Sequence, residues 1–172
     1  MLCETNPQEV MDLSPVAHLA TIEGKVPFIN FFDGFRTSHE IQKIEKWDYA
    51  DLKEMCNMDA VEAFRAHALN PEHPAMRGSH ENGDVFFQHR EACNTAYNEL
   101  PAIVEKYMAK INEKLGTNYD LFNYYGAEDA DRVIVAMGSV NDVAEEVIDY
   151  LTAKGEKVGL IKVRLYRPWV SE

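Results

Sequence analysis

The sequence predicts an α/β fold that ends in a parallel βαβ unit. Residues 132–163 have the pattern of a strand, an amphipathic helix and a second strand, which is typical of a right-handed βαβ unit. An apolar run at 26–32 that stops at a polar turn predicts one further strand, and helical periodicity dominates in between. We therefore expect a partial α/β piece, a helical middle segment and a C-terminal α/β domain.

The first helix is predicted to begin at Asn6, because a capping Asn followed by Pro7 is typical of a helix start. Pro15 should kink or restart this helix, and Gly24 should end it before the strand at 26–32. The apolar residues of this segment recur at helical spacing: Val10, Leu13, Val16, Ala17 and Ala20.

Capping signals divide the residues that follow the strand. Thr37 and Glu40 fit a capping box, which would open a short helix as far as Ile44. Asp48 and Asp59 predict two further helix starts.

The middle of the chain is predicted to be helical around one loop. Asn70-Pro71 should stop the helix that precedes it, and the proline and glycine residues of 71–84 predict a loop. A longer helical pattern over 91–115 should break at Pro101 and end at Gly116.

The last third has the clearest pattern. Residues 132–137 predict a buried strand, Gly138-Ser139 a tight turn, 141–154 an amphipathic helix and 157–163 a second strand. Parallel strands are normally covered on both faces of their sheet. The predicted α/β piece at the start of the chain contains too few helices and strands to cover both faces. We therefore expect the chain to be a piece of a larger protein.

Three regions follow from these elements. They are an α/β piece at 1–60, a helical linker region at 61–118 and an incomplete α/β domain at 119–172.

Composition excludes several classes of partner. The chain has 29 acidic and 17 basic residues, a net charge of −12, which argues against nucleic acid and anionic membrane surfaces. The three cysteines are far apart in the sequence, which suits free thiols in the cytoplasm. The sequence contains no Cys-x-x-Cys pair, so it predicts no zinc or iron–sulfur site. No apolar run is long enough to span a bilayer, and the N-terminus does not have the pattern of a signal peptide.

Four polar side chains follow the carboxyl end of the first predicted strand, where open α/β sheets bind ligands. They are Asp33, Arg36, Ser38 and His39. Arg36 is suited to clamp a carboxylate or phosphate, and His39 to move a proton near neutral pH. The competing interpretation is architectural: Asp33 belongs to a turn, and Arg36 pairs with Asp33 or another buried acid.

Other patterns favour structural roles. The turn Gly138-Ser139-Val140-Asn141 precedes a helix N-terminus, which can bind an anion, but it lacks the further glycines of a dinucleotide fingerprint. A plain turn capped by Ser139 or Asn141 is favoured. Four histidines match no usual metal-ligand spacing: His67, His73, His80 and His89. Neighbouring aromatic residues predict packing rather than base stacking: Tyr119, Phe122, Tyr124 and Tyr125.

With these elements placed, the sequence resembles the pyruvate:ferredoxin (or flavodoxin) oxidoreductase family. The string Phe31–Glu40 is its most specific anchor. Residues 132–169 resemble the family's second domain, which is similar to the C-terminal domain of transketolases. The remaining anchors are residues 18–21, 26–28, 88–91 and 123–130.

The resemblance implies a role within a long enzyme that oxidatively decarboxylates pyruvate to acetyl-coenzyme A. Electrons would pass through iron–sulfur clusters to ferredoxin or flavodoxin, with thiamine diphosphate and magnesium as further cofactors. Region 1–60 would be the C-terminal part of a thiamine-pyrimidine-type domain. The chain lacks the Gly-Asp-Gly motif and the cysteine runs of that enzyme, so we expect no catalytic residue, cofactor or metal in it.

Three functions remain open at this point. The leading hypothesis is a fragment of the oxidoreductase that is inactive alone and whose partners are the remaining domains. The alternatives are a non-catalytic interaction module and a small nucleotide-binding α/β protein that uses Gly138-Ser139. Self-association is a further expectation, because it would cover surfaces that a fragment exposes.

Overall fold

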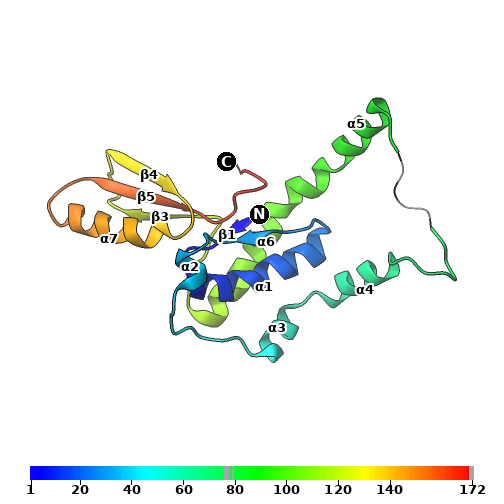
Figure 1. The fold of residues 1–172 in the computed structure, drawn as a ribbon, viewed down its shortest axis with the longest axis horizontal. Helices are drawn as coiled ribbons and strands as arrows, with labels where there is room; N and C mark the ends of the chain where they lie inside the picture. Colours follow the sequence, from blue (N-terminus) through cyan, green and yellow to red (C-terminus); the bar gives the residue numbers. More distant parts are fainter. Residues whose placement is uncertain (76–77, 79, 171–172) are drawn as a thin grey trace.

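The computed structural model describes residues 1–75, 78 and 80–170, and its architecture is mixed α/β (Figure 1). In chain order the elements are β1 (Leu2–Cys3), α1 (Pro7–Gly24), β2 (Asn30–Phe31), α2 (Arg36–His39), α3 (Tyr49–Met55), α4 (Met58–Ala66), α5 (Gly83–Ala92), α6 (Asn94–Leu115), β3 (Phe122–Gly126), β4 (Arg132–Ala136), α7 (Val140–Thr152) and β5 (Val158–Val163). Within these residues, no helix has both the length and the apolar character of a bilayer span.

The hydrophobic core lies where α1 packs against α6. Each helix turns one apolar stripe toward the other, as the helical spacing of the sequence predicts. The buried side chains of this contact are Leu13, Val16, Ala17 and Ala20 from α1 and Leu100, Val104, Tyr107, Met108 and Ile111 from α6.

The predicted start of α1 is confirmed. The Asn6 side chain accepts a hydrogen bond from the Glu9 backbone at 3.1 Å, and Pro7 occupies the first turn. Of the two outcomes predicted at Pro15, a kink or a restart, the restart is wrong, because α1 runs without interruption to Gly24. Packing against α6 outweighs the backbone hydrogen bond that a proline removes.

The predictions around the polar turn were partly wrong. The strand predicted at 26–32 contains only Asn30 and Phe31, because its partner β1 offers two residues to pair with. No capping box forms: α2 begins before Thr37, and the Thr37 hydroxyl donates to Asp33 at 3.2 Å. The helix also ends at His39 rather than continuing to Ile44.

Side-chain caps set the starts of α3 and α4. Asp48 accepts from the Ala50 backbone at 2.9 Å, which confirms the first predicted cap. The second prediction was two residues late, because Asn57 rather than Asp59 caps α4 by accepting from the backbone of Ala60 at 3.1 Å.

The predicted helix at 91–115 is two helices, α5 and α6. They separate at Cys93, whereas Pro101 lies inside an unbroken α6. Gly116 ends α6 with a left-handed φ of 70°, as expected. The predicted loop ends earlier than 84, since α5 already begins at Gly83. Residues 76–77 and 79 of that predicted loop lie outside the described residues.

The C-terminal part is a three-stranded sheet in the order β3-β5-β4. The predicted parallel pairing of β4 with β5 is confirmed, whereas β3, which pairs antiparallel with β5, was not predicted. The prediction of a buried strand at β4 is wrong: Ile134 and Val135 are 56% and 59% exposed. The reason is that α7 packs over β5 and β3 and leaves β4 at an open edge (Figure 1).

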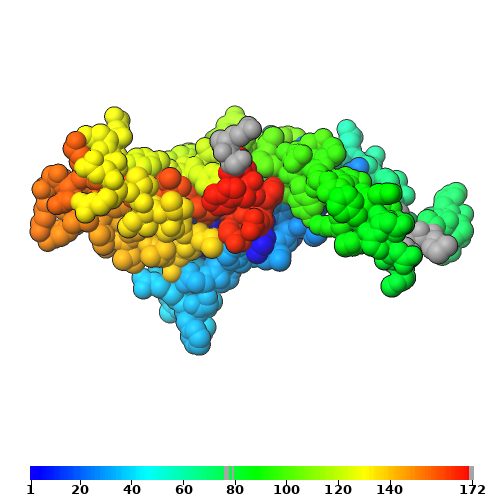
Figure 2. Space-filling view, turned by 90° about the horizontal axis from the view of Figure 1, so that it is seen from above, coloured from blue at the N-terminus to red at the C-terminus, as the bar shows by residue number. Residues whose placement is uncertain are grey.

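The N-terminal strand joins the two parts. The backbone of Cys3 donates to Arg164 at 2.9 Å, and Tyr166 donates to Met1 at 3.0 Å. Figure 2 accordingly shows the red C-terminal segment beside the dark-blue N-terminus, between the sheet at one end of an elongated molecule and α5 toward the other.

Candidate functional site

Asp33 connects the polar turn to the C-terminal part. Its carboxylate accepts from the Ser139 backbone at 3.0 Å and from the Ser139 hydroxyl at 2.9 Å. Desolvation opposes ionisation of Asp33, but these hydrogen bonds outweigh it and lower its pKa. The carboxylate therefore occupies the N-terminus of α7, where an external anion would otherwise bind. This arrangement disfavours nucleotide binding at Gly138-Ser139.

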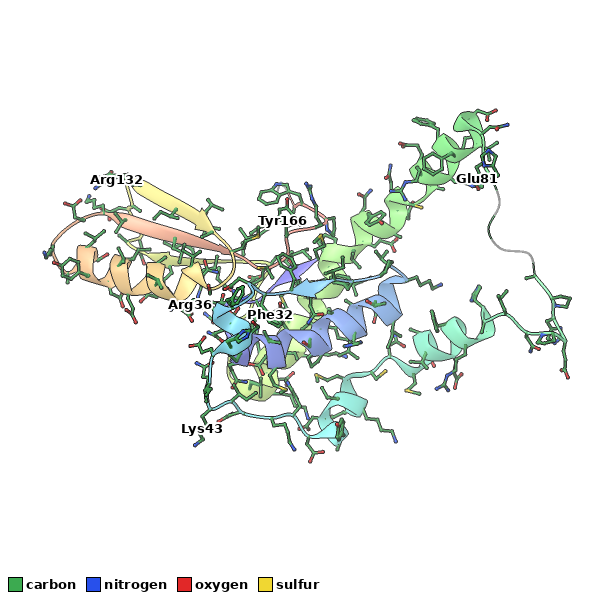
Figure 3. The ribbon with its side chains drawn as sticks, viewed as in Figure 1. Phe32, Arg36, Lys43, Glu81, Arg132 and Tyr166 are labelled. Atoms are coloured by element: carbon green, nitrogen blue, oxygen red, sulfur yellow. The ribbon has the colours of Figure 1, made fainter. Side chains whose placement is uncertain are left out.

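The other three predicted site residues lie on α2 and are exposed. The His39 ring stacks on Phe35 with centroids 5.6 Å apart, and its Nδ1 lies 2.8 Å from the Ser38 hydroxyl. Within the described residues, Arg36 forms no ion pair, so the predicted pairing with Asp33 is wrong. Figure 3 shows Arg36 on α2, which is drawn between α7 and α1. Among the described residues, the Asp33 side chain contacts Ser139 and Thr37 and forms no hydrogen bond or ion pair with the side chains of Arg36, Ser38 or His39.

Sequence reasoning missed a buried polar junction beneath this turn. Glu9 and Arg164 form an ion pair at 2.7 Å, with side chains only 10% and 4% exposed. Glu9 also accepts from the Thr5 backbone at 2.9 Å, and Asn141 donates to the Thr5 hydroxyl at 3.2 Å. These contacts join α1 and the residues before it to α7 and to the residue after β5, through charged and polar groups that are removed from water.

Two further titratable groups lie in β1 and the residue after it. Glu4 is fully buried, and neither carboxylate oxygen has a hydrogen-bond partner in the described chain. Burial raises its pKa to about 8, so the carboxyl holds a proton at neutral pH. Burial also raises the pKa of the Cys3 thiol to about 12, which makes this cysteine a poor nucleophile.

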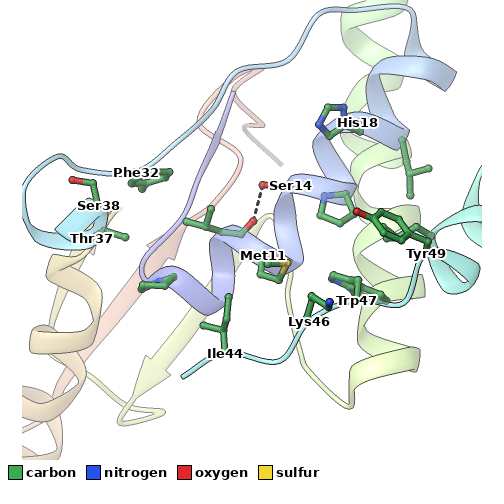
Figure 4. Close-up of a pocket in the computed structure, with 15 residues that line it drawn as sticks. Met11, Ser14, His18, Phe32, Thr37, Ser38, Ile44, Lys46, Trp47 and Tyr49 are labelled. Carbon is green, nitrogen blue, oxygen red and sulfur yellow. Dashed lines mark hydrogen bonds between the residues drawn. The ribbon is translucent and has the colours of Figure 1, made fainter. Parts of the chain in front are cut away.

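A groove of about 730 Å³ runs between α1, the polar turn and the segment that leads into α3 (Figure 4). Its walls are mostly apolar and aromatic, and Thr37 and Ser38 bring the polar turn to one end of it. Its lining includes Val10, Met11, Ser14, His18, Phe32, Ile44, Lys46, Trp47, Tyr49 and Leu52. A cavity of this size and composition is typical of small-molecule sites.

Two protein-family models match the chain in sequence order. The model of the family described as pyruvate flavodoxin/ferredoxin oxidoreductase, thiamine diphosphate-binding, matches residues 1–109. The chain belongs to this oxidoreductase family. The model described as pyruvate:ferredoxin oxidoreductase core domain II matches residues 130–172 of the same chain. The resemblance inferred from the string Phe31–Glu40 is therefore confirmed.

Curated oxidoreductases of this family match almost the whole chain. A pyruvate-flavodoxin oxidoreductase of Enterobacter agglomerans is 59% identical over 98% of the chain, which is 14% of that protein. A pyruvate:ferredoxin oxidoreductase of Moorella thermoacetica is 55% identical over 100% of the chain and 15% of its own length. A probable pyruvate-flavodoxin oxidoreductase of Escherichia coli K12 is 48% identical. The chain thus spans about a seventh of these oxidoreductases.

The candidate site residues Asp33, Arg36, Ser38 and His39 do not by themselves form a cofactor-binding site. Among residues 1–75, 78 and 80–170, no cluster of three or more His, Cys, Asp or Glu side chains is arranged to hold a metal ion. His89 pairs with Glu81 at 2.6 Å, and His67 Nδ1 lies 2.7 Å from the Ala63 carbonyl. No step through thiamine diphosphate is assigned to the described residues.

Proposed function

We propose that this chain acts as part of an enzyme that oxidatively decarboxylates pyruvate. In the overall reaction, pyruvate and coenzyme A give acetyl-coenzyme A and carbon dioxide, and two electrons pass to ferredoxin or flavodoxin. The observation that carries the proposal is the 59% identity over 98% of the chain to a pyruvate-flavodoxin oxidoreductase. Thiamine diphosphate, magnesium and iron–sulfur clusters would be bound by other parts of that enzyme, and the enzyme would be cytoplasmic.

Within that enzyme, the chain would hold two domains in a defined orientation. The support is the pair of hydrogen bonds from Ser139 to Asp33, together with the buried ion pair of Glu9 with Arg164. Both contacts join the part matched by the first family model to the part matched by the second. Asp33 is thus proposed as a positioning residue, whereas Arg36, Ser38 and His39 are proposed as contacts to a ligand or a neighbouring domain.

The three predicted regions belong to the same proposal. Region 1–60 would complete a thiamine-pyrimidine-type domain, 61–118 would be a helical linker, and 119–172 would be part of a transketolase C-terminal-like domain. The parallel β4-α7-β5 arrangement supports the last assignment. The open edge and the exposed apolar side chains of β4 support a neighbouring domain as its partner.

A chimeric enzyme tests this proposal. The segment of the Moorella thermoacetica oxidoreductase that aligns with this chain, 55% identical over 172 residues, would be replaced by it. We expect the chimera to reduce methyl viologen with pyruvate, and only when coenzyme A is present. The isolated chain, supplied with thiamine diphosphate, should show no such activity. A folded chimera without activity would contradict the proposed function, and activity of the isolated chain would contradict its dependence on other domains.

A further inference from the structure

The polar turn contains an unusual backbone conformation at Phe35, whose φ is 57° and whose ψ is −57°. The backbone of Arg36 donates to the Gly34 carbonyl at 2.6 Å, so Phe35 is the central residue of a γ-turn with a positive φ, which is rare and strained. A glycine would adopt this conformation easily, yet the neighbouring Gly34 has no positive φ. A bulky side chain in such a conformation persists only where the surrounding structure fixes the turn.

Hydrogen bonds on both sides of Phe35 fix this turn. The Asp33 carboxylate accepts two hydrogen bonds from Ser139 and one from the hydroxyl of Thr37, which is buried. Asp33 belongs to the part matched by the first family model and Ser139 to the part matched by the second. The strained turn therefore lies at the contact between the two matched parts of the chain.

The turn exposes an apolar side chain that the described residues leave uncovered. Phe35 is 87% exposed, and its ring stacks on that of His39 with centroids 5.6 Å apart. The hydroxyl of Ser38 lies 2.8 Å from His39 Nδ1 and helps to orient the His39 ring. Phe32 and Ile41, on either side of the turn, are also exposed. Burial of Phe35 by a partner would remove this apolar surface from water, which is favourable.

The shape of this region favours a protein partner over a small molecule. Figure 2 shows the light-blue segment around α2 projecting from the body of the molecule. Small-molecule sites are concave, whereas a projecting aromatic side chain is typical of the residues that anchor protein–protein interfaces. Phe35 also does not line the groove beside α1. The projecting turn is thus suited to enter a pocket on another protein surface.

We propose that Phe35 inserts into an apolar pocket on another domain of the oxidoreductase. This inference rests on the proposed function and places the exposed side of the turn against a neighbouring domain rather than a ligand. Two observations favour another domain over a second copy. The turn is continuous with the contact between the two matched parts, and the chain spans only about a seventh of the curated relatives. Because the turn is already fixed, docking would order few further groups.

Urea unfolding of the isolated chain tests whether Phe35 serves the stability of this chain itself. Phe35→Gly removes the ring and relieves the strain, whereas Phe35→Ala removes the ring and keeps a strained φ. We expect Phe35→Gly to unfold at a higher urea concentration than Phe35→Ala, and at no lower a concentration than the unchanged chain. A lower midpoint for Phe35→Gly than for the unchanged chain would show that Phe35 stabilises this chain without a partner, which would overturn the proposal.

Cysteine labelling in the chimeric oxidoreductase tests the docking. Phe35→Cys is compared with Tyr49→Cys, because both aromatic side chains are 87% exposed and Tyr49 lies at the start of α3, outside the strained turn. The tryptic peptides 26–36 and 47–53 contain no native cysteine, so mass spectrometry detects each maleimide adduct separately. Between the isolated chain and the chimera, labelling of Phe35→Cys should slow at least about tenfold, and labelling of Tyr49→Cys should slow less. Both sites should be labelled fully in the urea-unfolded chimera.

Several outcomes of the labelling would overturn the proposal. An unchanged rate for Phe35→Cys in the folded chimera would show that no other domain covers the turn, and equal slowing at both sites would show general burial rather than an anchor. Protection that appears in the isolated chain as its concentration rises would identify a second copy as the partner. Protection of the chimera only after addition of thiamine diphosphate or coenzyme A would identify a ligand. Labelling requires no turnover, so an inactive chimera that protects Phe35→Cys would contradict the proposed function alone.

Discussion

The buried ion pair between Glu9 and Arg164 provides the sharpest test of how the two parts of the chain are held together. In the variant Arg164→Met, the Glu9 carboxylate stays buried and loses its cation. The exposed pair of Arg132 with Glu156 is a matched control, because its N–O distance is 2.6 Å compared with 2.7 Å in the buried pair. The two pairs differ mainly in burial.

Burial determines the expected magnitudes. The side chains of Arg164 and Glu9 are 4% and 10% exposed, so water cannot replace the lost partner, and removal of one member should cost about 3–5 kcal/mol. Arg132 and Glu156 are 71% and 50% exposed, and Arg132→Met should cost at most about 1 kcal/mol. The first loss is a large fraction of the roughly 5–15 kcal/mol by which a domain is usually stable.

Urea unfolding followed by circular dichroism measures both losses. If Arg164→Met does not fold, Glu9→Gln is the second variant to measure. This substitution keeps the shape of the side chain and its contact with the Thr5 backbone. The double variant Glu9→Leu/Arg164→Met should recover part of the stability, because no buried charge is left unpaired. The reasoning is refuted if Arg164→Met costs no more than Arg132→Met.

Three further predictions concern single residues. Gly126→Ala should cost about 1–3 kcal/mol in thermal unfolding, because a Cβ would lie 2.6 Å from the Val158 carbonyl at a φ of 121°. Gly155→Ala, with φ 87° and open space around it, should cost less. Burial raises the folded-state pKa of Glu4 to about 8, so the stability that Glu4 contributes should be complete below pH 4.5 and be lost as the pH rises through about 8. Urea unfolding at several pH values measures this dependence, and Glu4→Gln should lack it. Asp33→Ala should cost about 1 kcal/mol in urea unfolding, whereas Ser38→Ala, on the exposed turn, should cost little; equal losses would contradict the role of Asp33 at α7.

Local chemistry explains which predictions from the sequence were correct. The starts of α1 and α3 depend on the side chains of Asn6 and Asp48, which contact backbone groups two or three residues away. The end of α6 depends on the left-handed φ that Gly116 adopts easily. Such interactions are complete within one helical turn, so the sequence contains all the information that they need.

The candidate site was less predictable, because its partners are distant in sequence. Asp33 and Ser139 are 106 residues apart, and Glu9 and Arg164 are 155 residues apart. One signal was present: Glu9 is an acid inside the first helix and Arg164 is a base directly after β5, but no spacing rule pairs them. The same limit explains why Thr37 was assigned to a cap, since its hydroxyl instead donates to Asp33.

The sequence alone determined the helix caps, the parallel strand–helix–strand unit and, through the string Phe31–Glu40, the family. Those features depend on periodicity and short-range hydrogen bonds, which residues close in sequence specify. Only the tertiary structure decided that Asp33 contacts Ser139 at the N-terminus of α7, that β4 is an open edge and that an apolar groove runs beside α1. Burial and long-range pairing arise only when distant segments pack together, and no local pattern records them.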